Sequence, residues 1–167
     1  MSARILTGAV AGCIVAAALG TATLATGRSA ATAAAAQDVE KSALFALLTG
    51  RKEVDTEGEK GAGDPDGRGS FTAIVDGGQL CYASTVKNIA TPAAAHIHRG
   101  SPEVAGDVVL PLDVPAAGDP GVVGDCTPIA ADLAARIMKN PHRYYVNVHT
   151  PDFGGGAVRG QLLRKPR

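Results

Sequence analysis

Three of the four histidines of this chain lie in two segments whose side chains alternate as in a β-strand. His96 and His98 flank Ile97, and His149 lies near the end of the run 144–150. Successive side chains of a strand point to opposite faces, so His96 and His98 share one face and Ile97 takes the other. Imidazole nitrogen is a common ligand of copper and zinc. The pattern therefore predicts a candidate metal site at His96, His98 and His149, with two ligands from one strand and a third from another.

The same alternation predicts further polar side chains on this face. Val146 and Val148 share one side of their strand, which leaves Asn147 on the side of the histidine. Arg159 and Gln161 alternate in the same way in the next apolar run. Neutral histidines can also pair with such side chains or with backbone carbonyls, because an imidazole offers one donor and one acceptor. A structural hydrogen-bond network is thus the alternative to a metal site, and the sequence leaves both open.

The N-terminal residues 1–36 differ in composition from the rest. Arg4 is followed by an uncharged stretch from Ile5 to Gly27, and an alanine run ends at Ala36, just before Gln37. A basic start, an apolar stretch and a small-residue cleavage site are typical of a secretory signal peptide. We therefore expect a secreted, extracellular protein. If cleavage fails, the uncharged stretch is long enough to anchor the protein in a membrane.

Two cysteines, Cys81 and Cys126, remain in residues 37–167. An even pair in an exported chain predicts a disulfide, because oxidising compartments allow it to form and persist. Two free thiols or a cysteine-bearing metal site are the alternatives. Neither cysteine has a second one two to four residues away, as zinc sites usually require.

Charge and motifs narrow the function. Removing Arg4 and Arg28 leaves 14 of the 16 basic residues against 16 acidic ones, with no basic patch, so we expect no nucleic-acid partner. The sequence has no internal repeat, and residues 37–167 suit one compact domain. No Gly-x-Ser-x-Gly motif occurs, and no cysteine is expected to be free. The sequence therefore favours a protein that is not an enzyme.

Short apolar runs separated by glycine and proline predict an all-β fold. Asp76-Gly77-Gly78 between two such runs indicates a tight hairpin. We expect an antiparallel β-sandwich, or a flattened barrel, of about seven strands. The expected strands are Leu44–Leu48, Ser70–Val75, Gln79–Lys87, Ala94–His98, Asp107–Leu112, Tyr144–Thr150 and Ala157–Leu163.

One segment has a helical pattern instead. Ile129, Leu133 and Ile137 recur at intervals of four, which is typical of the buried stripe of a helix. Thr127 can cap such a helix, and a proline at 128 suits its first turn. Because Pro141 disfavours helical geometry in the residue before it, we expect one short helix over residues 128–139 that covers an end of the sandwich.

The motifs also carry a family resemblance. The segments AAHIHRG (94–100), YYVNVHT (144–150) and GGGAVRGQL (154–162), in this order, resemble the CHRD domain, a module named for the repeats of chordin. The match extends upstream through Leu48-Thr49-Gly50 and covers roughly residues 42–163. The resemblance implies a module of the type that occurs singly in secreted bacterial proteins. It does not transfer chordin's growth-factor partners to this chain.

A second, looser resemblance concerns the histidines. An H-x-H pair on one strand, a late histidine and an arginine near the C-terminus are similar to the pattern of copper/zinc superoxide dismutases. Here Arg159 follows His149 by ten residues. No histidine lies between His98 and His142, so the zinc-binding part of that enzyme's site has no counterpart. The resemblance implies at most a partial site for copper or zinc.

Two functional hypotheses follow. The first is an exported structural or binding module of the CHRD type, whose partner is an unidentified extracellular protein or surface ligand. The alternative is a redox or metal-handling protein that binds copper or zinc through His96, His98 and His149. No other cofactor is expected, and a membrane partner is expected only if residues 1–36 stay attached.

Overall fold

A computed structural model describes residues 43–164 of the chain, so the predicted signal peptide (1–36) lies outside the described residues. The regular structure of the described part is one antiparallel sheet with one α-helix and two short 3-10 turns, which confirms the predicted all-β class. The strands, in chain order, are β1 (Ala43–Thr49), β2 (Arg68–Asp76), β3 (Gln79–Lys87), β4 (Ala94–Arg99), β5 (Asp107–Leu112), β6 (Gly121–Pro128), β7 (Tyr144–His149), β8 (Val158–Gln161) and β9 (Leu163–Arg164). The helix α2 spans Ala131–Lys139, and short 3-10 turns lie at Gly50–Lys52 and Pro141–Arg143.

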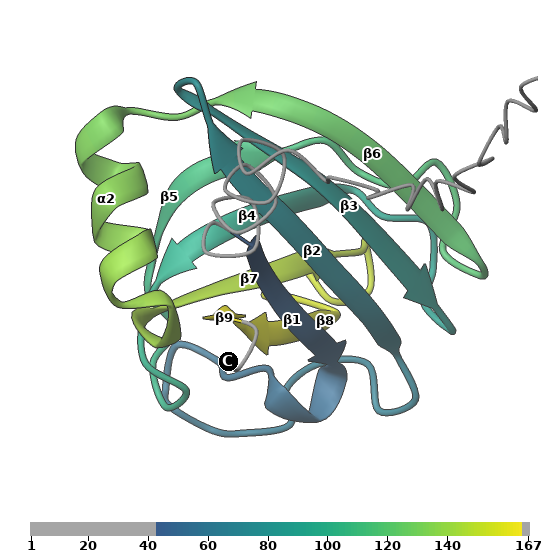
Figure 1. Ribbon diagram of the computed structural model, residues 1–167. Helices are drawn as coiled ribbons and strands as arrows, with labels where there is room; N and C mark the ends of the chain where they lie inside the picture. Colours follow the sequence, from purple (N-terminus) through teal and green to yellow (C-terminus); the bar gives the residue numbers. More distant parts are fainter. Residues whose placement is uncertain (1–42, 165–167) are drawn as a thin grey trace, which may run out of the picture.

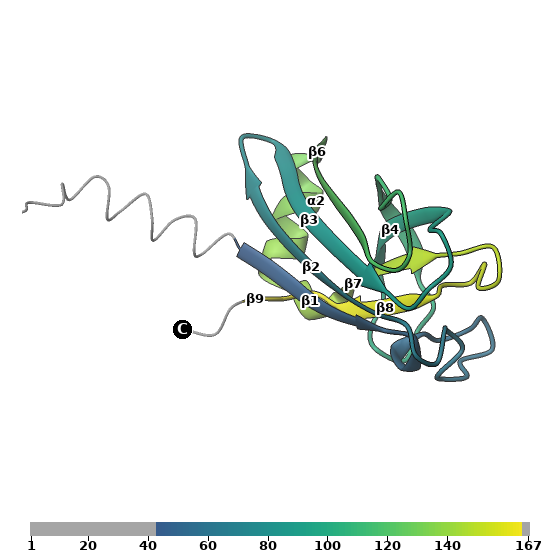
Figure 2. The same ribbon diagram turned by 90° about the vertical axis from the view of Figure 1, so that its right-hand side faces the viewer.

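All strands belong to one sheet in the order β5-β4-β7-β8-β1-β2-β3-β6, and β9 pairs with β1. The sheet folds over at the junction of β8 and β1, so its two halves face one another as the layers of a flattened barrel (Figure 2). Alternate side chains of each strand fill the space between the halves. The largest fully buried apolar side chains there are Phe71, Leu44, Leu48, Leu80, Ile97, Ile137, Leu162, Val86, Val146 and Val148.

The hairpin between β2 and β3 forms as predicted. Asp76 pairs with Gln79, and the two residues of the loop, Gly77 and Gly78, have φ angles of +55° and +79°. Only glycine adopts such angles readily, so these two residues fix the register of the longest ladder in the sheet.

The sequence prediction is wrong about two elements near residue 125. It missed β6, because this strand pairs with the edge of β3 and leaves most of its side chains exposed, so no buried alternation marks it. It also began the helix at residue 128, whereas Thr127 and Pro128 continue the ladder opposite Leu80 and Gln79. Pairing with β3 continues past these local helix signals, and α2 begins only at Ala131.

The predicted burial of the three apolar residues is nevertheless correct, although only Leu133 and Ile137 lie in the helix. Ile129, Leu133 and Ile137 are all buried in the core, and Figure 1 shows α2 at one end of the barrel, beside β5. The helix ends at Lys139, directly before Asn140 and Pro141, as expected. No helix in residues 43–164 combines the length and the apolar character needed to span a membrane.

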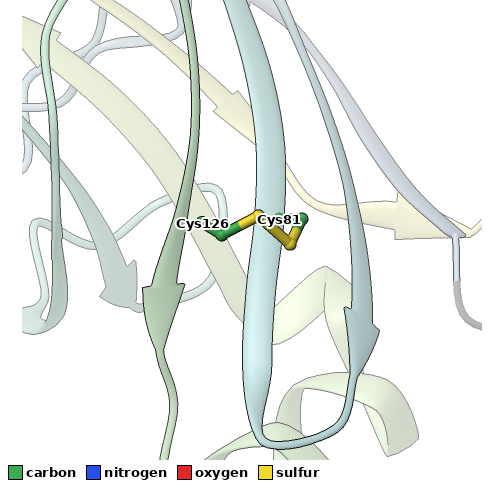
Figure 3. The surroundings of a disulfide bond; sticks show 2 residues. All are labelled: Cys81 and Cys126. Carbon is green, nitrogen blue, oxygen red and sulfur yellow. A yellow bond between two sulfur atoms is a disulfide. The ribbon is translucent and has the colours of Figure 1, made fainter.

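The predicted disulfide is present between Cys81 and Cys126 (Figure 3). The two cysteines are directly opposite one another on β3 and β6, so the bond ties the edge strand β6 to the sheet. It closes a loop with a sequence separation of 45 residues.

Removing this disulfide should lower the stability of the domain. Replacing both cysteines by serine is expected to reduce the free energy of unfolding by up to about 4 kcal/mol, because the unfolded chain regains the entropy of the open loop. Denaturant unfolding of both proteins measures the difference, and reducing the wild type should reproduce it. Two titratable thiols in the native wild-type protein would contradict the prediction.

Candidate metal centre

The pairing of β4 with β7 brings three histidines together. His96 lies opposite Asn147 and His98 opposite Tyr145, while His149 lies opposite Ala94. His149 is therefore diagonal to His96 on the same face of the sheet. One ring nitrogen from each histidine lies within 4.8 Å of those of the other two.

The hydrogen bonds of the rings orient two of these nitrogens. The Nδ1 atom of His98 lies 2.8 Å from the carbonyl oxygen of Gly106, and the Nδ1 atom of His149 lies 2.9 Å from that of Gly154. A carbonyl oxygen can only accept a hydrogen bond, so both Nδ1 atoms carry the proton. The lone pairs of His98 and His149 are then on Nε2. Such a backbone contact on the far nitrogen is the usual support of a metal-binding histidine.

The Nε2 atom of His98 is buried and has no hydrogen-bond partner among the described residues. Native proteins leave few buried polar atoms in this state, because losing the contact with water is costly. His98 is 8% exposed, whereas His96 and His149 are half-buried. The cluster thus has a dry side at His98 and a side open to solvent at the other two histidines.

The other nitrogens of the cluster lie close to one another. His96 Nδ1 is 3.1 Å from His149 Nε2, and the side-chain amide of Asn147 is also 3.1 Å from that atom. Because Nδ1 of His149 carries the proton, it is the NH₂ end of this amide that can donate to the Nε2 lone pair. When the site holds no ion, His96 can donate a hydrogen to the His149 lone pair. The opposite tautomer of His96 presents its own lone pair at the same place, so the contact is compatible with either a hydrogen-bond network or a bound ion.

Burial favours the neutral form of two of these rings. It lowers the pKa of His96, and the neighbouring His149 and His98 lower it further. Burial also lowers the pKa of His98, partly opposed by the hydrogen bond to Gly106. A neutral imidazole is the form that coordinates a metal. These two rings therefore stay neutral, and able to bind a metal, at pH values below the usual histidine pKa of about 6.5.

A second layer of side chains fixes the loop that carries Gly106. Gln161 donates from Nε2 to the carbonyls of Gly100 and His142, at 2.6 and 2.7 Å. The Tyr145 hydroxyl accepts a hydrogen bond from the Gly106 N–H at 3.1 Å. Arg159 donates from Nη2 to two carbonyls of the same loop, those of residues 101 and 104, at 2.8 and 3.1 Å. We call residues 100–106 the clasped loop.

Tyr145 connects this layer to the histidines. Its ring stacks on that of His98, with centroids 4.8 Å apart and an interplanar angle of 10°. From the neighbouring strand β8, the Arg159 guanidinium carbon lies 3.4 Å from the centre of the same ring. Such a cation over an aromatic face is attractive, and more so when it is shielded from water. Both contacts restrict the orientation of the His98 ring.

A buried carboxyl group, that of Glu53, interacts electrostatically with Arg159, and the sequence did not suggest that it belongs to the surroundings of the site. Glu53 is 2% exposed, and burial raises its pKa to about 7, an effect that the positive charge of Arg159 partly offsets. The carboxyl lies against the backbone of Gly156: a side-chain carbon at that position would meet it at 2.3 Å. Gly156 lies two residues beyond Gly154, so Glu53 packs against the loop that supports His149.

The residues predicted for the polar face therefore fall into two groups. The structure brings His96, His98 and His149 together, with Asn147 beside them. Arg159 and Gln161 bind the clasped loop instead of completing the cluster. The fourth histidine, His142, was not predicted as a ligand and is exposed in a 3-10 turn. The carbonyls of Gly106 and Gly154 were missed, because a backbone carbonyl has no sequence signature.

The comparisons with known proteins agree with the resemblance in the sequence. The family model of the CHRD domain matches residues 44–162, which include every strand involved in the cluster. Searches of curated proteins and of solved structures found no match. Since the match spans most of the sequence, the chain belongs to the CHRD domain family.

Proposed function

We propose that this CHRD module is exported and that its ligand is a single transition-metal ion, copper or zinc, bound by His96, His98 and His149. Export is supported by the signal-like residues 1–36 and by the disulfide, which suits an oxidising compartment. The two initial hypotheses then describe one protein, an extracellular binding module with a metal-handling role.

The observation that carries the metal proposal is the buried Nε2 atom of His98. Its ring is fixed by a carbonyl on the other nitrogen, so the lone pair has one direction and no partner in the described residues. An ion would satisfy it. In tetrahedral coordination with Zn–N bonds of about 2.0–2.1 Å, ligand nitrogens lie about 3.3 Å apart. The nitrogens here lie within 4.8 Å of one another, and two of them, His96 Nδ1 and His149 Nε2, are 3.1 Å apart.

Three neutral histidines leave a coordination position for solvent or a small ligand. His96 and His149 are half-buried, so this position faces the open side of the cluster. Nitrogen ligands bind Cu²⁺ more strongly than Zn²⁺, so we expect copper to bind more tightly.

Metal titration of the mature chain (residues 37–167) tests the proposal. After treatment with a chelator, calorimetry at pH 7.5 is expected to show one equivalent of Cu²⁺ or Zn²⁺ bound, and the ion should raise the melting temperature. Binding should persist through pH 6.5 and fall off below it, because the lowered pKa values of His96 and His98 keep these ligands neutral to lower pH.

The competing interpretation has a different signature. If the histidines form only a hydrogen-bond network, neither ion binds stoichiometrically or changes the melting temperature. Alanine at His96, His98 or His149 then only destabilises the fold, by about 1–3 kcal/mol each, by leaving a buried partner unsatisfied. That combination of results would reject the metal site and leave the module with an unidentified extracellular partner.

A further inference from the structure

A cavity separate from the histidine cluster lies beside β1. It has a volume of about 340 Å³, within the range of small-molecule sites. Arg159 and Gln161 form part of its lining. Their atoms Arg159 Nη2 and Gln161 Nε2 are already bound to carbonyls of the clasped loop and of the 3-10 turn at Pro141–Arg143, whereas Arg159 Nη1 is buried without a partner among the described residues. The remaining lining comes from β1, β9, the segment after β1 and the clasped loop.

The wall that β1 and β9 give this cavity is apolar, although a strand face that points to solvent is normally polar. Leu44, Ala46 and Leu48 of β1 face the core, as the strand alternation requires. Phe45 and Leu47 between them point outward, and Leu47 is 64% exposed. On the adjoining strand β9, Leu163 is 44% exposed and lines the same cavity. An apolar group of this kind beside a cavity is typical of a surface that binds a ligand.

The charged residues of the cavity are mainly cationic. Arg51 and Lys52 are exposed at its edge, and Lys52 donates from Nζ to the Leu47 carbonyl at 2.9 Å, which holds its ammonium over β1. Lys60 forms an ion pair with Glu103 at 2.6 Å, between the segment after β1 and the clasped loop. Glu103 is the single carboxylate of the lining and is already paired. Arg51 and Lys52 therefore leave a net positive charge beside an apolar wall.

We propose that this cavity binds an amphiphile with one anionic head and an unbranched apolar chain, of the class of medium-chain fatty-acid carboxylates. The apolar chain lies against Phe45, Leu47 and Leu163, and the carboxylate lies beside Arg51 and Lys52. Apolar area supplies most of the affinity, and the two cations select the charge of the head group. This inference is independent of the proposed metal site.

Calorimetric titration of the mature chain with hexanoate, octanoate and decanoate below their micellar concentrations tests it. We expect one molecule bound per chain, with affinity rising about fourfold for each added CH₂ group, the factor that corresponds to about 0.8 kcal/mol of buried apolar surface. Octan-1-ol and octyltrimethylammonium should bind at least about tenfold more weakly than octanoate, because they lack the charge that Arg51 and Lys52 attract.

Matched substitutions locate the site. Leu47→Asp should abolish binding of decanoate, since it removes apolar wall and adds a repelling carboxylate. Val122→Asp is the control, because Val122 is 69% exposed on β6 and does not line the cavity. Both positions are exposed, so both variants should keep the wild-type circular dichroism spectrum. Replacing Arg51 and Lys52 together by alanine should weaken octanoate but leave octan-1-ol unchanged.

Several results would overturn the proposal. They are the absence of saturable binding, equal affinity for octanoate and octan-1-ol, and equal loss of binding in Leu47→Asp and Val122→Asp. An anionic lipid head group in a membrane carries the same kind of charge as the free carboxylate. Cosedimentation of the protein with phosphatidylglycerol vesicles therefore tests whether it binds a membrane instead of a soluble amphiphile. Sedimentation without binding of free carboxylates would reject the cavity as a site for a soluble amphiphile.

Discussion

Replacing His98 by alanine is expected to weaken binding of copper or zinc by about 1000-fold, more than the roughly 10- to 100-fold that loss of a supporting partner costs. The reason is the position of His98 in the cluster. It is the most buried of the three histidines, and its Nε2 atom has a fixed direction and no other partner in the described part of the chain. Alanine supplies no ligand atom at this buried side of the site. Calorimetric titration of wild type and variant at pH 7.5 measures the change.

Two further variants make this result specific. His142→Ala should leave the affinity unchanged, because His142 is exposed and stands outside the cluster. His98→Gln retains an amide donor for the Gly106 carbonyl but supplies a poor ligand, so it should lose the metal while losing less stability than His98→Ala. If His98→Ala binds the ion as tightly as the wild type does, the centre proposed here does not exist.

Replacing Arg159 by alanine should produce the largest loss of stability, about 3–5 kcal/mol, which is typical of removing one partner from a buried charged network. Arg159 is 1% exposed and donates to two carbonyls of the clasped loop. Without it, those carbonyls lose their donor, and Glu53 loses the positive charge that partly offsets the rise of its pKa on burial. Denaturant unfolding of both proteins measures the difference.

The same variant should also bind metal more weakly, by roughly 10- to 100-fold, because a loosened loop no longer holds Gly106 against His98. Arg99→Ala is the matched control. Arg99 is exposed at the end of β4, so its removal should change stability by less than about 0.5 kcal/mol. Arg159→Lys keeps the charge but lacks the planar fork, and it should fall between wild type and Arg159→Ala. Unchanged metal affinity in a folded Arg159→Ala protein would show that the clasped loop does not act on His98.

Much of the fold could be predicted because its signals are local. Strand alternation is a property of neighbouring residues, so it gave the positions of most strands and placed His96 and His98 on one face. The glycine pair of the β2–β3 hairpin and the apolar stripe of α2 are equally local. Strand β6 had no such signal, since an edge strand with exposed side chains is held by its ladder to β3 and by the disulfide.

The sequence by itself determined the family, the all-β class, the pairing of the two cysteines and the histidines that could act together. Only the tertiary structure decided that His149 meets His96, from which it is 53 residues distant in the chain, because this depends on the register between β4 and β7. It also decided that Arg159 and Gln161 support a loop and that two backbone carbonyls fix the histidine rings. The contacts of His96 with His149, and of Arg159 and Gln161 with the clasped loop, join segments that are 53 to 61 residues apart in the chain, so they form only when the barrel closes.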